Sequence, residues 1–361
     1  MLVGADAFWR RARGDVARAR RRVLVQAMTF EGDEVGQTVA AAIAASVALD
    51  RRVLVDAYSR MTVSDRAVYS LSGLFDRALR AEVKATDAMF RGLNAAGVRV
   101  RMTNPIGLLL ANYPARNHKK LIVADDVAYL GGVNFSDHNF AWTDFMLRLE
   151  GEEAADFLAA DFDATFEGRA RPARLDLPLL TLISLDGREN AGAFGEIMSL
   201  IDQARAGIVV LSAYLTFPVT EALARAARRG VAVRLITPLA NNKPIVRDYL
   251  LATAAAAGFE VTLLPAMSHL KGLLIDGEIL IGGSSNFDFV SLAAEEEYLL
   301  ISRDEALIAD FQARIIQPSF AEALPADAAP RRSGRLAYIA LKIAERVALA
   351  ARGARRTAVG W

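Results

Sequence analysis

One short pattern occurs twice in the sequence, and this repeat limits what the chain can fold into. The pattern His-x-Lys-x4-Asp occupies residues 118–125 and again residues 269–276. Each copy is followed by an apolar stretch, a pair of glycines and an asparagine, which is Asn134 in the first copy and Asn286 in the second. An internal repeat of this kind predicts two similar structural halves, and we expect a pseudo-two-fold axis to relate them.

The chain upstream of each copy alternates between strand-like and helix-like stretches. Residues 23–30 and 51–58 in the first half, and 208–217 and 231–239 in the second, are apolar strand candidates. Strands that alternate with helices are typical of βα units, in which helices cover a largely parallel sheet. We therefore expect an α/β fold of two similar halves. Each half would hold a mixed, largely parallel sheet flanked by helices, with the active site between the halves.

Two stretches rich in Pro, Ala and Arg mark the expected domain boundaries. We expect a first domain over residues 1–167, a linker over 168–178, a second domain over 179–324 and a basic tail over 325–361. Residues 59–90 add a segment to the first half, and the sequence does not indicate its role.

Composition excludes several classes of site. The chain has no cysteine, which rules out disulfides, a thiolate nucleophile and cysteine-ligated metals, and its three histidines are too few for a histidine-rich metal centre. No apolar run reaches the roughly 20 residues needed to span a bilayer, and arginines interrupt the N-terminus before a signal sequence could form. We expect no metal, no cofactor, no signal peptide and no transmembrane helix, in a peripheral protein on the cytoplasmic side of the cell membrane.

The residue types of the repeated pattern suit phosphate chemistry. A single His-x-Lys is usually an exposed strand end, but here two of the three histidines and two of the scarce lysines occupy equivalent positions. Histidine can attack or transfer a proton near neutral pH, lysine places a point charge on a phosphate oxygen, and asparagine donates an amide N–H. Two facing copies could stabilise a phosphoryl transition state without a metal. The candidate residues are His118, His269, Lys120, Lys271, Asn134 and Asn286.

The glycine pairs add a further match. In the second copy Gly283 and Ser284 precede the asparagine, and in the first copy Gly132 stands in place of the serine. The doubled pattern with these residues resembles the phospholipase D superfamily, whose mark is a duplicated His-x-Lys-x4-Asp followed by Gly-Ser/Gly-x-Asn.

Three longer stretches narrow the resemblance to one branch of that superfamily. Residues 115–126, 142–151 and 285–300 resemble conserved blocks of bacterial cardiolipin synthases, and the resemblance covers roughly residues 5–320. Two features depart from that branch. Glu295 stands where the branch usually carries an asparagine, and the N-terminal membrane helices of many such synthases are missing.

The resemblance implies a phosphohistidine mechanism and a role for each candidate. His118 would be the nucleophile, and His269 the general acid and base. Asp144 and Glu297, which follow these histidines by 26 and 28 residues, would be their respective carboxylate partners. Ser284 would join the lysines and asparagines around the substrate phosphate.

The aspartates that end each copy are expected to be structural. Asp125 and Asp276 each stand at a turn, where an aspartate can close the hairpin through local hydrogen bonds. His138 belongs to no motif, and we expect it in a loop.

The C-terminal tail is basic and amphipathic. From Arg331 onward it carries eight Arg or Lys and one acid, a net charge of +7. A helix over residues 336–352 would be either an interfacial anchor on an anionic membrane or a docking helix on the protein's own core. Residues 105–113 are a second apolar stretch, which would line an acyl-chain entrance or belong to the core. The expected helix face comprises Leu336, Ile339, Ile343 and Val347, beside a stripe of Arg335, Lys342 and Arg346.

The residues and the resemblance together predict a phosphatidyltransferase of the cardiolipin synthase type, which transfers a phosphatidyl group to phosphatidylglycerol. Two alternatives use the same doubled site: a phospholipase D-type hydrolase, and a nuclease or other phosphodiesterase of the superfamily. A nuclease would carry a basic groove with interleaved aromatics, whereas basic residues here gather in the tail and near residues 10–22. We expect a phospholipid substrate and an anionic membrane surface as partners rather than nucleic acid. The sequence does not indicate an oligomeric state.

Overall fold

The structure, a computed structural model, describes residues 1–106, 112–324, 328, 334–353 and 357–361, and it divides into two compact units. The N-terminal unit comprises Leu2–Ala141, Phe145–Arg171 and Ala354–Trp361, and the C-terminal unit comprises Met1, Trp142–Asp144 and Pro172–Gly353. Three residues from the middle of the first half therefore belong to the second unit. The domain boundaries expected from the sequence stay a prediction.

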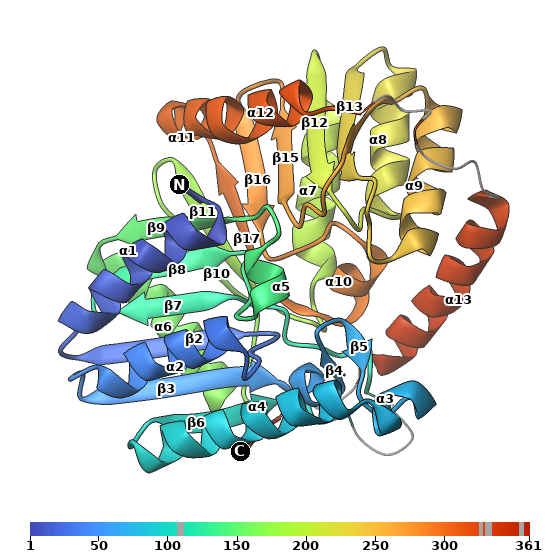
Figure 1. Cartoon of the computed structure of the whole chain (residues 1–361). Helices are drawn as coiled ribbons and strands as arrows, with labels where there is room; N and C mark the ends of the chain where they lie inside the picture. Colours follow the sequence, from blue (N-terminus) through green and yellow to red (C-terminus); the bar gives the residue numbers. More distant parts are fainter. Residues whose placement is uncertain (107–111, 325–327, 329–333, 354–356) are drawn as a thin grey trace. The chain divides into compact units, whose positions relative to one another are not determined.

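The N-terminal unit is built on one mixed sheet with helices on both faces (Figure 1). Among the described residues its strand order is β1-β9-β8-β7-β2-β3-β6-β18. Helices α1, α2 and α4 pack side by side on one face, and α6 packs on the other. The strands are β1 (Leu2–Val3), β2 (Arg22–Ala27), β3 (Asp50–Asp56), β6 (Arg99–Thr103), β7 (Leu121–Ala124), β8 (Val127–Gly131), β9 (Phe145–Glu150) and β18 (Ala358–Gly360), with a separate hairpin of β4 (Thr62–Val63) and β5 (Arg66–Ala67). The helices are α1 (Ala5–Arg18), α2 (Glu34–Ala45), α3 (Leu71–Phe75), α4 (Arg77–Ala95), α5 (Asp137–Phe140) and α6 (Glu152–Phe166).

The C-terminal unit repeats this plan. Its strand order among the described residues is β10-β11-β17-β16-β15-β12-β13-β14, with α7, α8 and α9 on one face and α11 and α12 on the other (Figure 1). The strands are β10 (Ala173–Asp176), β11 (Leu180–Asp186), β12 (Gly207–Ser212), β13 (Ala232–Pro238), β14 (Glu260–Leu264), β15 (Lys271–Ile275), β16 (Ile279–Gly283) and β17 (Glu296–Ser302). The helices are α7 (Ala191–Gln203), α8 (Val219–Arg228), α9 (Pro244–Ala257), α10 (Phe289–Ala294), α11 (Glu305–Phe311), α12 (Gln317–Ala321) and α13 (Gly334–Ala351).

The predicted α/β class with helix-flanked mixed sheets is confirmed, but the sheets are less parallel than expected. Strands β2, β3 and β6 are parallel in one unit, and β12, β13 and β14 are parallel in the other. The remaining ladders among the described strands are antiparallel. The reason is that each motif opens a hairpin, β7–β8 or β15–β16, and a tight turn reverses the chain direction.

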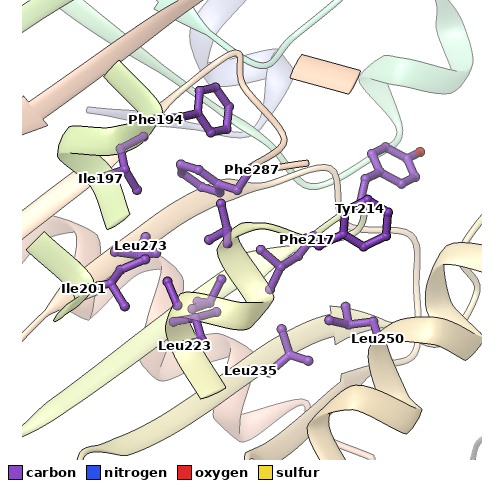
Figure 2. Close-up of a cluster of buried hydrophobic side chains, with 14 of the residues drawn as sticks. Phe194, Ile197, Ile201, Tyr214, Phe217, Leu223, Leu235, Leu250, Leu273 and Phe287 are labelled. Atoms are coloured by element: carbon purple, nitrogen blue, oxygen red, sulfur yellow. The ribbon is translucent and has the colours of Figure 1, made fainter. Parts of the chain in front are cut away.

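The core of the C-terminal unit holds the second motif on a rigid strand. In α7, Phe194, Ile197 and Ile201 recur at helical spacing and are buried. They belong to one cluster with Leu223 of α8 and Leu273 of β15 (Figure 2). Every residue of β15 is buried, so the lysine that begins this strand is anchored by a packed core.

The tail folds onto both units rather than standing apart. Helix α13 packs on α9 and α10, and it approaches α9 so closely that a Cβ on Gly334 would lie 2.1 Å from Ala252 Cβ. Strand β18 pairs with β6 in the N-terminal sheet. There Trp361 packs on Phe90, with ring centroids 4.2 Å apart. The last residues are therefore part of the N-terminal fold.

Helix α13 docks through a different face from the one that the sequence indicated. Its small side chains, such as Ala337 and Ala348, face the core of the C-terminal unit together with Leu341. The predicted apolar face stays exposed: Leu336 is 69% and Ile343 is 60% accessible to solvent. In the described part of the chain, no helix is both long and apolar enough to cross a bilayer. Of the second apolar stretch, residues 107–111 lie outside the described residues.

Candidate functional site

The second motif places His269 and Lys271 at the start of β15. Both side chains are buried, with 6% and 1% of their surface accessible. The backbone N–H of His269 donates to the carbonyl of Thr143 at 2.8 Å, and Ser268 forms a parallel β-bridge with the same residue. The segment Trp142–Asp144 thus runs beside the residues that lead into the second motif, within the C-terminal unit.

Asp144 pairs with His269 and not with the histidine that precedes it in the sequence. Its Oδ2 lies 2.8 Å from His269 Nδ1, and the carboxylate is 2% accessible. The prediction that Asp144 serves His118 is therefore wrong. Spacing along the chain misled it, because the short segment Trp142–Asp144 crosses into the other unit. A carboxylate on Nδ1 fixes the imidazole tautomer and leaves Nε2 available for chemistry.

Two aromatic rings frame the imidazole of His269. The ring centroid of Trp142 lies 5.4 Å from that of His269, and the ring centroid of Tyr214 lies 5.9 Å away. These contacts restrict rotation of the imidazole and lower the local polarity around it. Sequence analysis noted Trp142 only as part of a resemblance, and it missed Tyr214.

Lys271 is held next to the backbone of its own histidine. Its Nζ donates to the carbonyl of His269 at 2.5 Å. Burial lowers the pKa of Lys271 to about 8, against the opposing charges of Asp144 and Glu297. An added phosphate would raise this pKa, because a second anion favours the ammonium form.

Glu297 is the most enclosed carboxylate of this unit's motif region. It is fully buried on β17, and it accepts hydrogen bonds from the hydroxyls of Ser284 and Ser291. Ser284 was predicted to bind the substrate phosphate, but its hydroxyl here donates to Glu297. A phosphate oxygen would have to replace that bond, so the role of Ser284 at the phosphate stays a prediction.

Asn286 follows the hairpin and keeps one polar atom unengaged. Its Oδ1 is buried and has no hydrogen-bond partner among the described residues. Its main-chain carbonyl accepts from the hydroxyl of Ser212 at 3.2 Å, which fixes its backbone. A buried polar atom without a partner is uncommon and marks a place where a ligand could bind.

The first motif repeats the lysine contact in the N-terminal unit. Lys120 Nζ donates to the carbonyl of His118 at 2.6 Å, and both side chains are buried. Between them, Lys119 turns the other way and binds Asp161 of α6 at 2.8 and 3.0 Å. Asn134 lies nearby in the fold of this unit, where its Oδ1 accepts from the backbone N–H of Thr29 at 3.2 Å.

A buried network fixes the residues that precede His118. Asp56, at the end of β3, accepts from Arg116 Nη1 and from the backbone N–H of Asn117, each at 2.7 Å. Gln26 of β2 donates to the side chain of Asn117, also at 2.7 Å. Burial raises the pKa of Asp56, and Arg116 opposes the rise. In the sequence, residues 115–126 were noted only as part of a resemblance, and Asp56 was missed, because its only signal was its place at a strand end.

The motif aspartates have one geometry in both units. Asp125 and Asp276 adopt φ of 54° and 53°, in the left-handed region that aspartate tolerates at turns. Each carboxylate accepts three consecutive backbone N–H groups at 2.8–3.0 Å, from Arg20–Arg22 or from Arg205–Gly207. Burial raises the pKa of both carboxyls, but these bonds outweigh it and leave both lowered.

Those bonds correct one detail of the prediction. The two aspartates bind backbone N–H groups, but they do not close their own hairpins as the sequence suggested. Asp125 binds the start of β2, 103–105 residues earlier in the sequence, and Asp276 binds the start of β12, 69–71 residues earlier. Sequence reasoning assumed local bonds because the strand pairing was unknown.

An acidic cluster also lies in the N-terminal unit. Carboxylate oxygens of Glu31, Asp33 and Glu82 lie within 4.8 Å of one another, and such oxygens could hold a hard cation. Burial raises the pKa of Glu31 to about 8 and that of Asp33 to about 6. Bound protons can therefore neutralise part of the negative charge of this cluster. His138 was expected in a loop, but it lies in the short helix α5. Its Nδ1 is 3.7 Å from Glu31 Oε2.

Comparison with known proteins finds cardiolipin synthases. A family profile described as "Cardiolipin synthase, PLD-like domain" matches residues 197–317. Cardiolipin synthase B of Salmonella typhi is 28% identical over 341 residues, covering 84% of this chain and 76% of that protein. The minor cardiolipin synthase ClsB of Bacillus subtilis is 27% identical over 282 residues, covering 72% of this chain and 70% of that protein. The profile match includes the whole second motif.

Two solved structures share the fold over nearly all of this chain. Phosphatidylserine synthase of Haemophilus influenzae superposes with a TM-score of 0.69 at 15% identity, covering 97% of this chain and 93% of that one. Polyphosphate kinase from Porphyromonas gingivalis superposes with a TM-score of 0.58 at 16% identity, covering 94% of this chain and 54% of that one. At these identities the likeness establishes the fold alone.

Proposed function

We propose that the chain is a member of the phospholipase D superfamily and a phosphatidyltransferase of the cardiolipin synthase type. The relatives support a phospholipid phosphatidyltransferase of this superfamily. The finer proposal is that the chain moves a phosphatidyl group to phosphatidylglycerol. The observation that carries it is the duplicated histidine and lysine arrangement, in which one histidine already holds a carboxylate on Nδ1.

The reaction would proceed in two displacements at phosphorus. His118 attacks the phosphodiester of the donor lipid and forms a P–N bond, while the leaving alcohol takes a proton from His269 Nε2. Neutral His269 then accepts the proton of a glycerol hydroxyl on phosphatidylglycerol. That oxygen attacks phosphorus, the P–N bond breaks, and His118 is restored. Asp144 stabilises the imidazolium form of His269 in the first step.

The internal repeat assigns a carboxylate to His118 as well. Gly132 N–H donates to the carbonyl of Phe145, and Ser284 N–H donates to the carbonyl of Tyr298. Phe145 and Tyr298 are therefore equivalent, and so are the residues before them, Asp144 and Glu297. Because Asp144 serves the histidine of the other copy, we propose that Glu297 serves His118.

The remaining motif residues would stabilise charge on the phosphate. Lys120 and Lys271 supply ammonium groups for the nonbridging oxygens, and Asn134 and Asn286 supply amide N–H groups. The unengaged Oδ1 of Asn286 supports this role, since an amide with a free polar end can reorient toward a ligand. Ser284 is a further candidate at the phosphate.

The exposed face of α13 supports attachment to an anionic membrane. Leu336 and Ile343 point to solvent, and Arg335 and Arg346 flank them on the same helix. Apolar side chains bordered by basic ones suit the interface of a bilayer that carries anionic lipids. We propose that the protein binds the cytoplasmic face of the cell membrane peripherally, through this surface of the tail.

The test is lipid turnover by the full chain on phosphatidylglycerol vesicles, with and without EDTA. Cardiolipin plus glycerol is the expected product pair. Phosphatidic acid instead would indicate the hydrolase, and no turnover of any lipid would overturn the proposal and favour a phosphodiesterase acting on nucleic acid. His118→Asn and His269→Asn should each reduce turnover at least about 10³-fold. His138→Asn, which changes the third histidine, is the matched control and should keep activity.

A further inference from the structure

Glu295 and Glu297 form a buried carboxyl pair, of which the mechanism above uses only one member. Glu295 precedes β17 and is 7% accessible, and Glu297 is not accessible at all. Ser291 of α10 contacts both: its Oγ lies 3.0 Å from Glu295 Oε2 and 2.9 Å from Glu297 Oε1. Two carboxyl groups therefore share one hydroxyl.

The number of available protons determines which group donates to which in these two contacts. A serine hydroxyl carries one proton, so Ser291 can donate fully to only one carboxyl. The other contact is satisfied when that carboxyl carries a proton and donates it to Ser291 Oγ. Of the two carboxyls, Glu297 is the one whose ionised form is more stabilised, because the Ser284 hydroxyl also donates to it. The consistent arrangement runs from Glu295 O–H to Ser291 Oγ, and from Ser291 O–H to Glu297.

The surrounding charges agree with a protonated Glu295. Burial, followed by the charges of Glu297 and Asp288, raises the pKa of Glu295 well above its ordinary value, against the ammonium of Lys243. Lys271 on β15 faces Glu297 of the same pair, and burial lowers the pKa of this lysine to about 8. Two adjacent buried anions would be costly here, and one shared proton removes that cost.

The backbone around the pair is fixed by a single amide. Asn190 Nδ2 donates to the carbonyls of Ser291 and Glu295, at 2.7 and 2.8 Å. These bonds tie the end of α10 to the start of β17. The contacts of Ser291 with the two carboxyls are thus held in place before any substrate binds.

The first copy of the repeat lacks this arrangement. Since Asp144 corresponds to Glu297, the residue two positions earlier, Trp142, corresponds to Glu295. Trp142 packs on His269 and carries no titratable proton. The carboxyl at position 295 is therefore a feature of one half only.

We propose that Glu295 is a positioning residue of the active site: it keeps a proton, donates it to Ser291, and thereby directs the Ser291 hydroxyl to an ionised Glu297. This inference rests on the proposed function, in which Glu297 serves His118. The proton stays on Glu295 during the reaction, and no bond to substrate forms there. At high pH Glu295 ionises and no longer donates to Ser291. The hydrogen-bond relay from Glu295 through Ser291 to Glu297 is then lost, and activity falls.

The first test does not depend on any substrate. The infrared spectrum of the folded full chain at neutral pH should contain a carboxylic-acid C=O stretch that disappears in Glu295→Gln. Glu278→Gln, at an exposed turn, is the matched control and should remove no such band. If Glu295→Gln also removes no acid band, Glu295 is ionised and the proposal is overturned.

The second test measures positioning. Glu295→Leu and Ser291→Ala remove the relay, and each should lower kcat about tenfold with little change in KM, as expected for one lost hydrogen bond. Glu295→Gln keeps a donor toward Ser291 at every pH, so it should recover most of that loss and extend activity to higher pH. Lys271 titrates in all variants, so the comparison isolates position 295.

Equal kcat and an unchanged pH profile in Glu295→Leu and Glu295→Gln would overturn the positioning role. If the wild-type chain turns over no lipid, the proposed function fails instead, and the infrared result alone decides whether Glu295 holds the proton.

Discussion

The two copies of the motif share a framework and differ in the charges placed around it. In both, the lysine Nζ binds the carbonyl of its own histidine, at 2.6 Å for Lys120 and 2.5 Å for Lys271. In both, the motif aspartate accepts three backbone N–H groups at the start of the neighbouring strand, β2 or β12. The shared contacts run to main-chain atoms, so they tolerate divergence of the surrounding side chains.

The differences lie in side-chain partners. Between histidine and lysine the first copy has Lys119 in a buried ion pair, and the second has the apolar Leu270. Asp144 binds an imidazole directly, whereas two serine hydroxyls hold Glu297. Repeated scaffolds thus fix where the reactive groups stand, while the unequal surroundings suit the two histidines to different tasks. Each prediction below tests one shared or one unequal feature.

Asp144→Asn should have the largest effect, because it removes the charge that orients His269. We expect kcat to fall about 10³-fold, within the range for loss of an orienting carboxylate. NMR of the imidazole protons should show a changed Nδ1–H for His269 and an unchanged signal for His118. A change confined to the His118 signal would contradict the pairing of Asp144 with His269 and favour the pairing with His118 that sequence spacing suggested.

Lys119→Leu should come next, because it gives the first copy the apolar residue of the second. It leaves Asp161 buried without its ammonium partner, and the free energy of unfolding should fall by about 3–5 kcal/mol in urea titrations. The double variant Lys119→Leu, Asp161→Leu should recover most of that loss. Equal stability of the wild type and the single variant would mean that the ion pair is dispensable.

Asp125→Asn and Asp276→Asn should have smaller and similar effects, since the two carboxylates make the same bonds. We expect each to lower the free energy of unfolding by about 1–2 kcal/mol near neutral pH. Both folded-state pKa values are lowered, so this stability is present above the ordinary pKa of 3.8 and is lost as pH falls through the folded value. Wild type and variants should therefore converge in acid. A large difference between the two variants would show that the frameworks are not equivalent.

Ile343→Ser should have the smallest effect, on the exposed apolar face of α13 in the C-terminal unit. Losing one exposed apolar side chain from α13 should weaken binding to anionic vesicles about fivefold, because it removes roughly 1 kcal/mol of apolar burial in the bilayer. Leu49→Ser changes an even more exposed residue of the N-terminal unit and is the control. Equal vesicle binding by both variants would contradict the role of α13.

Sequence reasoning located the motif residues because their spacing is local and repeated. His118 and His269, with their lysines, lie at the start of buried hairpins in both units, where alternation along a strand predicts them. The α/β class followed from a different pattern, the alternation of strand-like and helix-like stretches along the chain. The hairpins themselves were expected, but the antiparallel pairing of their strands with the rest of each sheet was not.

The remaining errors concern contacts that no local pattern encodes. The pairing of Asp144 depends on three residues that cross into the other unit. The ion pair of Lys119 was not foreseen, because its partner Asp161 lies 42 residues away in the sequence. The docking face of α13 is made of alanines with Leu341, which a hydrophobicity pattern cannot distinguish from a neutral face.

The central claim, that His118 attacks phosphorus and His269 transfers protons, can be tested by trapping the intermediate. The substrate is phosphatidyl-p-nitrophenol, whose leaving group departs without a proton, so the first step does not need His269. The second step does need it. In His269→Asn we therefore expect one phosphatidyl adduct per chain, mapped by mass spectrometry to His118, and no adduct in His118→Asn. An adduct on His269 in His118→Asn, or nitrophenol release by both variants without any adduct, would contradict the assignment.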